Sequence, residues 1–235
     1  MRKDSVNNTH SSYSVKSSSE IRPCVYCAGP LFNHAERREM TEIADVLTEA
    51  DFPVFLPHRD GMEFRKIHHV LVEQGWNAVQ SSRFLHEAIF ALDVYQLADA
   101  CGAMVWNLNG RVPDEGAVSE AAIAWTLGKP LIAFSDDARS LIAGRMNPLL
   151  VGLVDFETVH EVDDIPDVLQ KAIQKTGSPK RTIDSLPAAL QRAIEEGSQL
   201  WTAMKDQSAD GNDEQIAELV VQLFASRNQQ ASLAS

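Results

Sequence analysis

The stretch "CGAMVWNLNGRVPDEGAVSEAAIAWTLGKPLIAFS" (residues 101–135) decides the fold, because it contains a complete strand, helix and strand unit. Residues 101–108 and 130–135 are short, nearly continuous apolar runs, which are typical of buried parallel strands. Between them, a polar loop with Gly and Pro leads into an almost wholly apolar helix. This order predicts a parallel sheet that is covered by helices.

The same alternation of strands and helices continues on both sides of this unit. We therefore expect an α/β fold, an open parallel flavodoxin- or Rossmann-like sheet flanked by helices, with a C-terminal helical extension. A long surface excursion is expected at residues 58–80, where the sequence is mixed and polar. The other expected strands are residues 22–28, 52–57 and 149–156, and the other expected helices are residues 33–50, 82–100 and 165–176.

Composition along the chain predicts three segments. Residues 1–20 are rich in Ser and Asn and are expected to be a disordered tail. Residues 21–177 contain the alternating strands and helices of the α/β domain. Residues 178–235 are expected to be a linker and a helical pair, since two stretches at about 187–205 and 213–226 carry one-sided apolar stripes.

Charge, hydropathy and cysteine content argue against several classes of protein. The 235 residues carry a formal net charge of -12, and no basic stripe is visible, which argues against nucleic acid as a partner. No apolar run is long enough to span a membrane, and the first twenty residues lack the apolar core of a signal peptide. The three cysteines are too few for a disulfide framework, so we expect a cytoplasmic protein.

Cys24 and Cys27 form a CxxC pair, which raises the question of a metal or redox site. The pair lies within an expected strand, where residues three apart point to opposite faces, so we interpret both as core cysteines. His68 and His69 are adjacent and have no partner at metal-ligand spacing. We therefore expect neither a metal nor a cofactor.

Acidic residues stand in two otherwise apolar helices. Glu120 follows the loop by one turn, near a helix N-terminus that favours an ionised carboxylate, and Asp93 lies in the middle of "FALDVYQLADA". An ionised carboxylate in a dry crevice is suited to act as a nucleophile at a sugar anomeric centre. In the alternative interpretation, Asp114 caps the helix, Glu120 is solvated and Asp93 pairs with a surface Arg. Spacing alone leaves both interpretations open.

Ligands of open parallel sheets bind in the loops beyond the carboxyl ends of the strands. The loop "AGPLF" after the first expected strand has one Gly and no Lys, so it is neither a Rossmann nor a P-loop fingerprint. Gly29 would allow the backbone to approach a ligand, and Phe32 would offer a flat apolar face.

Taken together, "VYCAGPLF", "HAERREM", "FPVFLPHRDG" and the stretch from "ALDVYQ" to "PLIAF" resemble the nucleoside 2-deoxyribosyltransferases. The resemblance runs from Pro23 to Asn147 and is most specific in the Asp-x-Gly-x-x-x-Glu of residues 114–120. The chain departs from the family at Ala121 and Ala122, where an apolar residue and Gly are common. It also departs at "NLNG", where Asp often precedes the Gly.

The resemblance implies roles for four side chains. Glu120 would attack C1′ of a 2′-deoxynucleoside and form a covalent deoxyribosyl-enzyme, while Tyr26 would orient the Glu120 carboxylate. Asp93 would protonate or hydrogen-bond the leaving base. Asp114 would bind the sugar 5′-hydroxyl. A second base would then attack from the same face, so that the exchange is ping-pong with net retention.

The resemblance also implies further substrate contacts and an assembly. Phe32 would lie beside the base, Asp60 would line the base pocket, and an Asn from a neighbouring subunit, here Asn147, would enter the site. The expected partners are thus a nucleoside, a free nucleobase and further copies of the chain. The remaining expected substrate contacts, from the loops, are Ala28, Gly29 and Gly116.

Two alternatives remain open from the sequence. The 2′-deoxynucleoside 5′-phosphate N-hydrolases share the Glu but transfer the sugar to water, and they tend to have Ser in place of Asp114. A non-catalytic nucleotide-sensing module is the second alternative, with the C-terminal helices as its output device.

Overall fold

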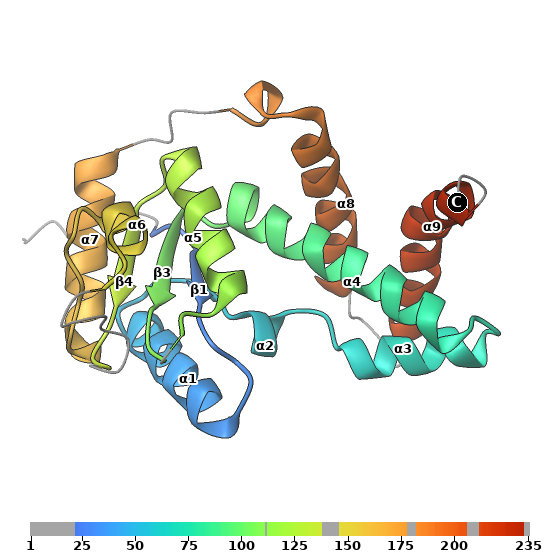
Figure 1. Ribbon diagram of the computed structural model, residues 1–235, viewed down its shortest axis with the longest axis horizontal. Helices are drawn as coiled ribbons and strands as arrows, with labels where there is room; N and C mark the ends of the chain where they lie inside the picture. The colour runs from blue at the N-terminus through green and yellow to red at the C-terminus, as the bar shows by residue number, and fades with distance from the viewer. Residues whose placement is uncertain (1–21, 111, 138–145, 178–181, 206–211, 233–235) are drawn as a thin grey trace, which may run out of the picture.

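The computed structural model describes residues 22–110, 112–137, 146–177, 182–205 and 212–232, with side chains described up to residue 225. The expected tail at residues 1–20 lies outside the described residues. The sheet has four parallel strands in the order β2-β1-β3-β4, which confirms the expected open α/β sheet (Figure 1). The strands are β1 (Val25–Ala28), β2 (Val54–Phe55), β3 (Ala103–Asn107) and β4 (Leu131–Phe134).

Burial on both faces explains why these runs are apolar without interruption. All residues of β1 and β3 are buried, and Val25 pairs with Ala103 while Met104 pairs with Leu131. Because the strands are parallel, the loops after β1, β3 and β4 lie at the same edge of the sheet. That edge therefore brings together segments that are far apart in the sequence.

One face of the sheet is covered by α1 (His34–Glu49) and α7 (Ile165–Thr176), which pack on Val25, Cys27 and Val105. Asn33 caps α1 through a capping box with Glu36, as the sequence pattern of a helix start requires. The expected helices at residues 33–50 and 165–176 are confirmed.

The other face is covered by α5 (Glu115–Leu127), which packs on the side chains of Tyr26, Met104 and Trp106. The residues that α5 buries against this face are small, since they are the alanines Ala117, Ala121 and Ala124. Small side chains let the helix approach the strands closely, and this brings the second turn of α5 near the side chain of Tyr26.

A second group of helices lies beside the sheet (Figure 1). The long helix α4 (Ala78–Tyr95) runs from the sheet into this group, where its apolar face packs with those of the other helices around Phe84, Leu200 and Phe224. The two C-terminal helices agree with the apolar stripes in the sequence. The members are α3 (Phe64–Glu73), α4 (Ala78–Tyr95), α8 (Ala188–Lys205) and α9 (Asn212–Ser232).

Two expectations about secondary structure are wrong. Residues 58–80 are not a surface excursion, because they contain α2 (Pro57–Asp60) and α3, whose Ile67 and Leu71 are buried in the helical group. The expected strand at 149–156 is instead α6 (Pro148–Val151) followed by the short 3-10 helix η3 (Gly152–Val154). Pro148 at the first helical position and the Asn147 cap favour that helix start. Within the described residues, no helix is both long and apolar enough to cross a membrane.

Candidate active site

Tyr26 and Glu120 form the centre of the candidate site. Tyr26 lies on β1 with its side chain fully buried, and its ring stacks on that of Phe55 at 5.5 Å between centroids. The phenolic hydroxyl of Tyr26 donates a hydrogen bond of 2.6 Å to Oε1 of Glu120, the sixth residue of α5. A buried, stacked ring has little freedom, so this bond fixes the position of the Glu120 carboxylate.

The surroundings of Glu120 raise its pKa to about 7. Burial is the largest cause and the charge of Asp114 adds to it, while the hydrogen bond from Tyr26 lowers the pKa. Glu120 is thus partly buried and bound by Tyr26, in place of the fully solvated side chain of the alternative interpretation. Burial opposes the expected effect of the helix start, which favours the ionised form, because Glu120 lies beyond the first turn of α5.

Asp93 is the second carboxyl group of the site. It lies near the end of α4, just before the π-helical turn η1 (Gln96–Ala100), a deviation that is frequent at functional sites. Burial and, next, the charge of Glu120 raise the pKa of Asp93 to about 8. An ion pair with a surface Arg would lower this pKa, so the raised value contradicts that alternative. Asp93 is mainly protonated at neutral pH.

Asp114 is the N-cap of α5, with Oδ1 accepting a hydrogen bond of 2.7 Å from the backbone N–H of Ala117. The interpretation of Asp114 as a helix cap is thus confirmed. Its charge also acts on Glu120. A carboxylate has two oxygens and several acceptor sites, so the cap is compatible with a contact to a ligand.

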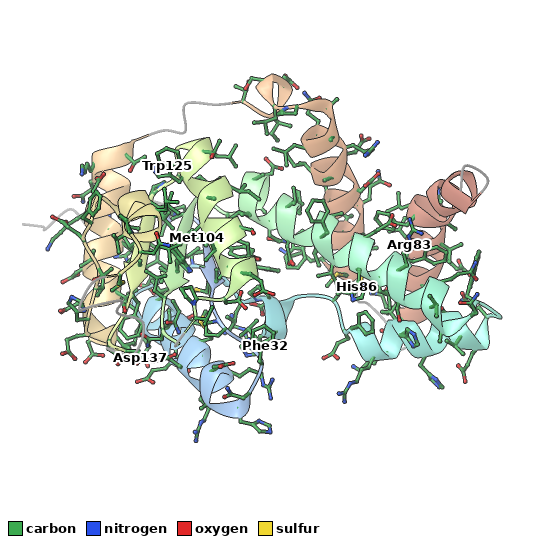
Figure 2. All side chains as sticks on the ribbon, in the orientation of Figure 1. Phe32, Arg83, His86, Met104, Trp125 and Asp137 are labelled. Atoms are coloured by element: carbon green, nitrogen blue, oxygen red, sulfur yellow. The ribbon has the colours of Figure 1, made fainter. Side chains whose placement is uncertain are left out.

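The loop after β1 lies at the same edge of the sheet. Phe32 is 78% exposed and lies near α1 and α2 (Figure 2). Ala28 and Gly29 are buried. A Cβ at Gly29 would lie 2.5 Å from Sδ of Met40 and 2.8 Å from Cβ of Asn107. Internal packing therefore explains this glycine, without the approach of backbone to a ligand that the sequence led us to expect.

The remaining expected substrate contacts differ in their surroundings. Asp60 ends α2, where it accepts a hydrogen bond from the backbone N–H of Leu56 at 2.8 Å and pairs with Arg59 at 2.9 Å. Gly116 is exposed in the first turn of α5. Asn147 is exposed and caps α6 through the backbone N–H of Leu149. Local bonds thus account for the positions of Asp60 and Asn147.

The structure adds a polar network that the sequence did not reveal. Asn109 donates from Nδ2 to Glu39 at 2.7 Å and to Asp136 at 2.6 Å, and its Oδ1 accepts the backbone N–H groups of Asp136 and Asp137. Asn107 donates to the other oxygen of Glu39 at 2.8 Å. Because Asn107 and Asn109 are buried, the network ties the start of the loop that leads to Asp114 to α1 and to the end of β4. The sequence signal for this network is the pair of amides, Asn107 and Asn109, at the end of an otherwise apolar strand.

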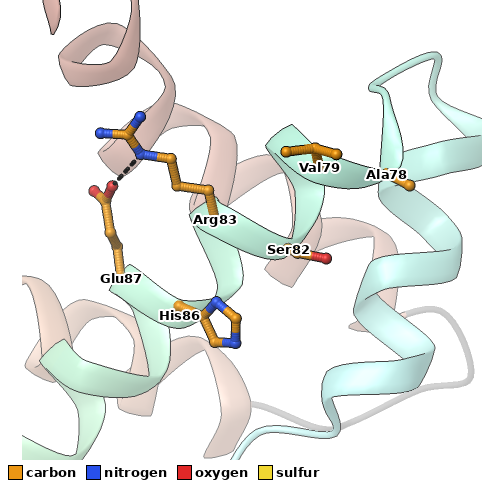
Figure 3. Close-up of a pocket in the computed structure, with 6 residues that line it drawn as sticks. All are labelled: Ala78, Val79, Ser82, Arg83, His86 and Glu87. Carbon is orange, nitrogen blue, oxygen red and sulfur yellow. Dashed lines mark ion pairs between the residues drawn. The ribbon is translucent and has the colours of Figure 1, made fainter.

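A hollow in the described surface lies away from these acids. It has a volume of about 540 Å³ and lies along the first turns of α4, where Glu87 pairs with Arg83 at 3.4 Å (Figure 3). Ten residues of helix separate Arg83 from Asp93, or about 15 Å at 1.5 Å per residue. Among the described residues, no group of three or more His, Cys, Asp or Glu is arranged to hold a metal ion.

Comparison with known proteins gives the family. The family model described as "Nucleoside 2-deoxyribosyltransferase" matches residues 25–217. The chain belongs to this family. The match extends well beyond Asn147, where the resemblance seen in the sequence ended, and it includes all of α8. The family indicates a nucleoside-modifying enzyme.

Other comparisons add little to the family assignment. No curated protein matches the chain. Among solved structures, a conserved protein from Enterococcus faecalis V583 is similar with 20% sequence identity and a TM-score of 0.47. The match covers 64% of this chain and 98% of the Enterococcus chain.

Proposed function

We propose that the protein transfers 2-deoxyribose from a 2′-deoxynucleoside to a second nucleobase through a covalent intermediate on Glu120. The hydrogen bond of 2.6 Å between Tyr26 and Glu120 is the observation that carries this proposal, because it holds one oxygen of a partly buried carboxylate in place. A carboxylate nucleophile that is held in one orientation needs little reorganisation when it attacks.

In the first step, ionised Glu120 attacks C1′ and forms an ester bond to the sugar. The bond between C1′ and the base nitrogen breaks, and its electron pair leaves with the base. Asp93 donates its proton to the base as the base leaves, so that the base departs as a neutral molecule and Asp93 becomes ionised. The raised pKa of Asp93, about 8, keeps that proton available at neutral pH.

In the second step, a nitrogen of the incoming base attacks C1′ from the face that the first base left. The ester bond to Glu120 breaks, and Asp93 takes up the proton of the incoming base. Two inversions give net retention at C1′. The protein ends in its initial protonation state, with Glu120 ionised and Asp93 protonated.

Incubation with deoxyinosine, with and without free adenine, tests this proposal. Chromatography should show hypoxanthine and deoxyadenosine only when adenine is present. Release of hypoxanthine and free deoxyribose in both samples would support N-glycoside hydrolysis in place of transfer. The absence of any cleavage with purine and pyrimidine deoxynucleosides or their monophosphates would support the sensing module.

Glu120→Gln is the matched variant, since it keeps the size of the side chain and an oxygen that accepts from Tyr26. We expect a loss of at least about a hundredfold in transfer and in hydrolysis, because the amide cannot form the ester. A slow 2′-fluoro nucleoside should leave a sugar adduct on Glu120 that mass spectrometry detects. A Glu120→Gln protein with near-normal turnover would refute covalent catalysis.

A further inference from the structure

Cys24 and Cys101 form a thiol pair that the proposed reaction does not use. Their sulfur atoms lie 3.3 Å apart, although the residues are 77 positions apart in the sequence. Both are free cysteines, with Cys24 half-buried and Cys101 fully buried. Cys27, which forms the CxxC pair with Cys24 in the sequence, lies buried on the other face of the sheet.

The backbone holds the two cysteines side by side. The carbonyl of Cys24 accepts the N–H of Gly102 at 2.8 Å and that of Ala103 at 3.3 Å. A Cβ at Gly102 would lie only 2.6 Å from Cβ of Pro23, so the glycine is needed for this close approach. A disulfide bond is about 2.05 Å long, and the sulfurs therefore need to move together by only about 1.3 Å.

The charges around the pair favour a reactive thiolate on the more accessible sulfur. The pKa of Cys24 is lowered, first by the hydrogen bond from the thiol of Cys101 and also by the charge of Lys205, against opposing effects of burial and Asp60. Lys129 is buried next to the pair, and its ammonium group donates to the carbonyl of Cys101. Partial exposure together with nearby cations is typical of cysteines that oxidants attack.

We propose that Cys24 and Cys101 are an oxidative modification site, at which a hydroperoxide converts the two thiols into an intramolecular disulfide. The Cys24 thiolate attacks the peroxide and the O–O bond breaks, so that Cys24 becomes a sulfenic acid. The hydroxide that leaves takes up the proton that the Cys24 thiol had released and becomes the first water. Cys101 then attacks the sulfur of Cys24, and the hydroxyl group leaves with the proton of Cys101 as water. Two thiols are oxidised to one disulfide, and one hydrogen peroxide is reduced to two waters.

The disulfide would tether β1, which carries Tyr26, to the end of η1, which continues the helix of Asp93. Closing a long loop of the chain stabilises a fold by restricting the unfolded state. We expect the oxidised protein to have a higher thermal unfolding midpoint than the reduced protein. The site itself does not depend on the proposed transfer reaction.

Treatment of the full chain with a small excess of hydrogen peroxide, followed by denaturation and alkylation, tests the proposal. Mass spectrometry should show one remaining alkylated thiol, on Cys27, and a linked peptide lighter by the mass of two hydrogen atoms. Cys24 and Cys27 lie on one tryptic peptide, because Pro23 blocks cleavage after Arg22 and the next basic residue is Arg37. Cys27→Ala therefore serves as the matched control, which should oxidise as the wild type does.

Cys101→Ser separates the two chemical steps. In this variant Cys24 should stop at the sulfenic acid, which dimedone traps, and circular dichroism should confirm that the variant is folded. Cys24 should react at least about tenfold faster than Cys27 in the wild type, because Cys27 is fully buried. The proposal is overturned if Cys24 and Cys101 both remain alkylated after oxidation, or if the disulfide forms between two chains.

Discussion

Asp93 and Glu120 lie close enough that the charge of Glu120 raises the pKa of Asp93. The two carboxyl groups have pKa values of about 8 and about 7, so Glu120 loses its proton first as the pH rises. Two carboxyl groups with separated pKa values are suited to opposite roles, one as an acid and one as a nucleophile. Their order agrees with the roles that we propose.

The rate of transfer should therefore have a narrow pH optimum. The productive form has Glu120 ionised and Asp93 protonated, and it is most populated between about pH 7 and pH 8. We expect kcat/KM to follow a bell-shaped profile with apparent pKa values of the pair near these two values. A profile that is flat from pH 6 to pH 9 would contradict the assignment.

Tyr26→Phe should shift the acidic side of that profile. The hydrogen bond from Tyr26 lowers the pKa of Glu120, so removing the hydroxyl should raise this pKa and move the rise in kcat/KM to higher pH. We also expect a loss of about tenfold or more in kcat at the optimum, because the carboxylate is no longer held in place. Binding of an inert nucleoside analogue, measured by calorimetry, should change little and serves as the control.

Ionisation of Asp93 at alkaline pH should lower the free energy of unfolding. Its folded-state pKa is raised from 3.8 to about 8, so the folded protein binds this proton more tightly than the unfolded chain does. The resulting stabilisation is complete below about pH 4 and is lost as the pH rises through about 8. A shift of this size corresponds to at most about 6 kcal/mol, and because Asp93 is only partly buried, we expect on the order of 2 kcal/mol.

Asp93→Asn provides the measurement. The amide does not titrate, so the thermal midpoint of the variant should fall less than that of the wild type between pH 5 and pH 9. Asp99→Asn, an exposed acid of the adjoining η1, is the matched control and should behave as the wild type does. Equal pH dependence in all three proteins would show that Asp93 is not perturbed in solution. Transfer activity of Asp93→Asn should fall as well.

The sequence predicted the sheet well, because its strands are apolar runs whose burial is set by local pattern. It failed at residues 58–80, since Ile67 and Leu71 become buried only against helices that lie far away in the sequence. Periodicity placed Glu120 and Asp93 in apolar helices, but only the resemblance to a family paired them with Tyr26. Two amides at an apolar strand end mark the network around Asn109, but its acidic partners, in α1 and after β4, come together only in the fold.

Asn147 provides a test of assembly. It is exposed on α6, and we propose that it enters the site of a neighbouring subunit. Two inactive variants, Glu120→Gln and Asn147→Ala, should regain part of the activity when mixed under conditions of subunit exchange, because hybrid sites contain both native residues. Light scattering that shows a fully active monomer would contradict this role. Asn147→Asp keeps an oxygen acceptor for the α6 cap and controls for local unfolding.

Asn109→Asp should disturb the loop that carries Asp114. The native amide donates to both Glu39 and Asp136, and a carboxylate in its place would lose both of these bonds and put three acids together. We expect lower stability above about pH 5 and a loss of activity that partly recovers at lower pH. Asn109→Ser, which keeps a donor without adding charge, should be affected less at neutral pH. Identical pH dependence of the two variants would show that charge at this position is unimportant.

We propose that the choice of substrate at the 5′ end depends on the charge of Asp114. A carboxylate accepts a hydrogen bond from a 5′-hydroxyl that is worth about 1.5–3 kcal/mol, whereas a 5′-phosphate would add about two negative charges beside it. The charge of Asp114 already reaches Glu120, so a phosphate bound at this helix start would meet two acids. We therefore expect deoxynucleosides to be turned over and deoxynucleoside monophosphates to be poor substrates.

Asp114→Asn and Asp114→Ser both retain a cap for α5, so a change in preference can be separated from a loss of the helix start. Both variants should narrow the difference in kcat/KM between nucleoside and monophosphate by about tenfold or more, and Ser should favour the monophosphate most. If the wild-type protein prefers the monophosphate, Asp114 does not bind the 5′-hydroxyl, and hydrolysis of nucleotides becomes the better account of this site.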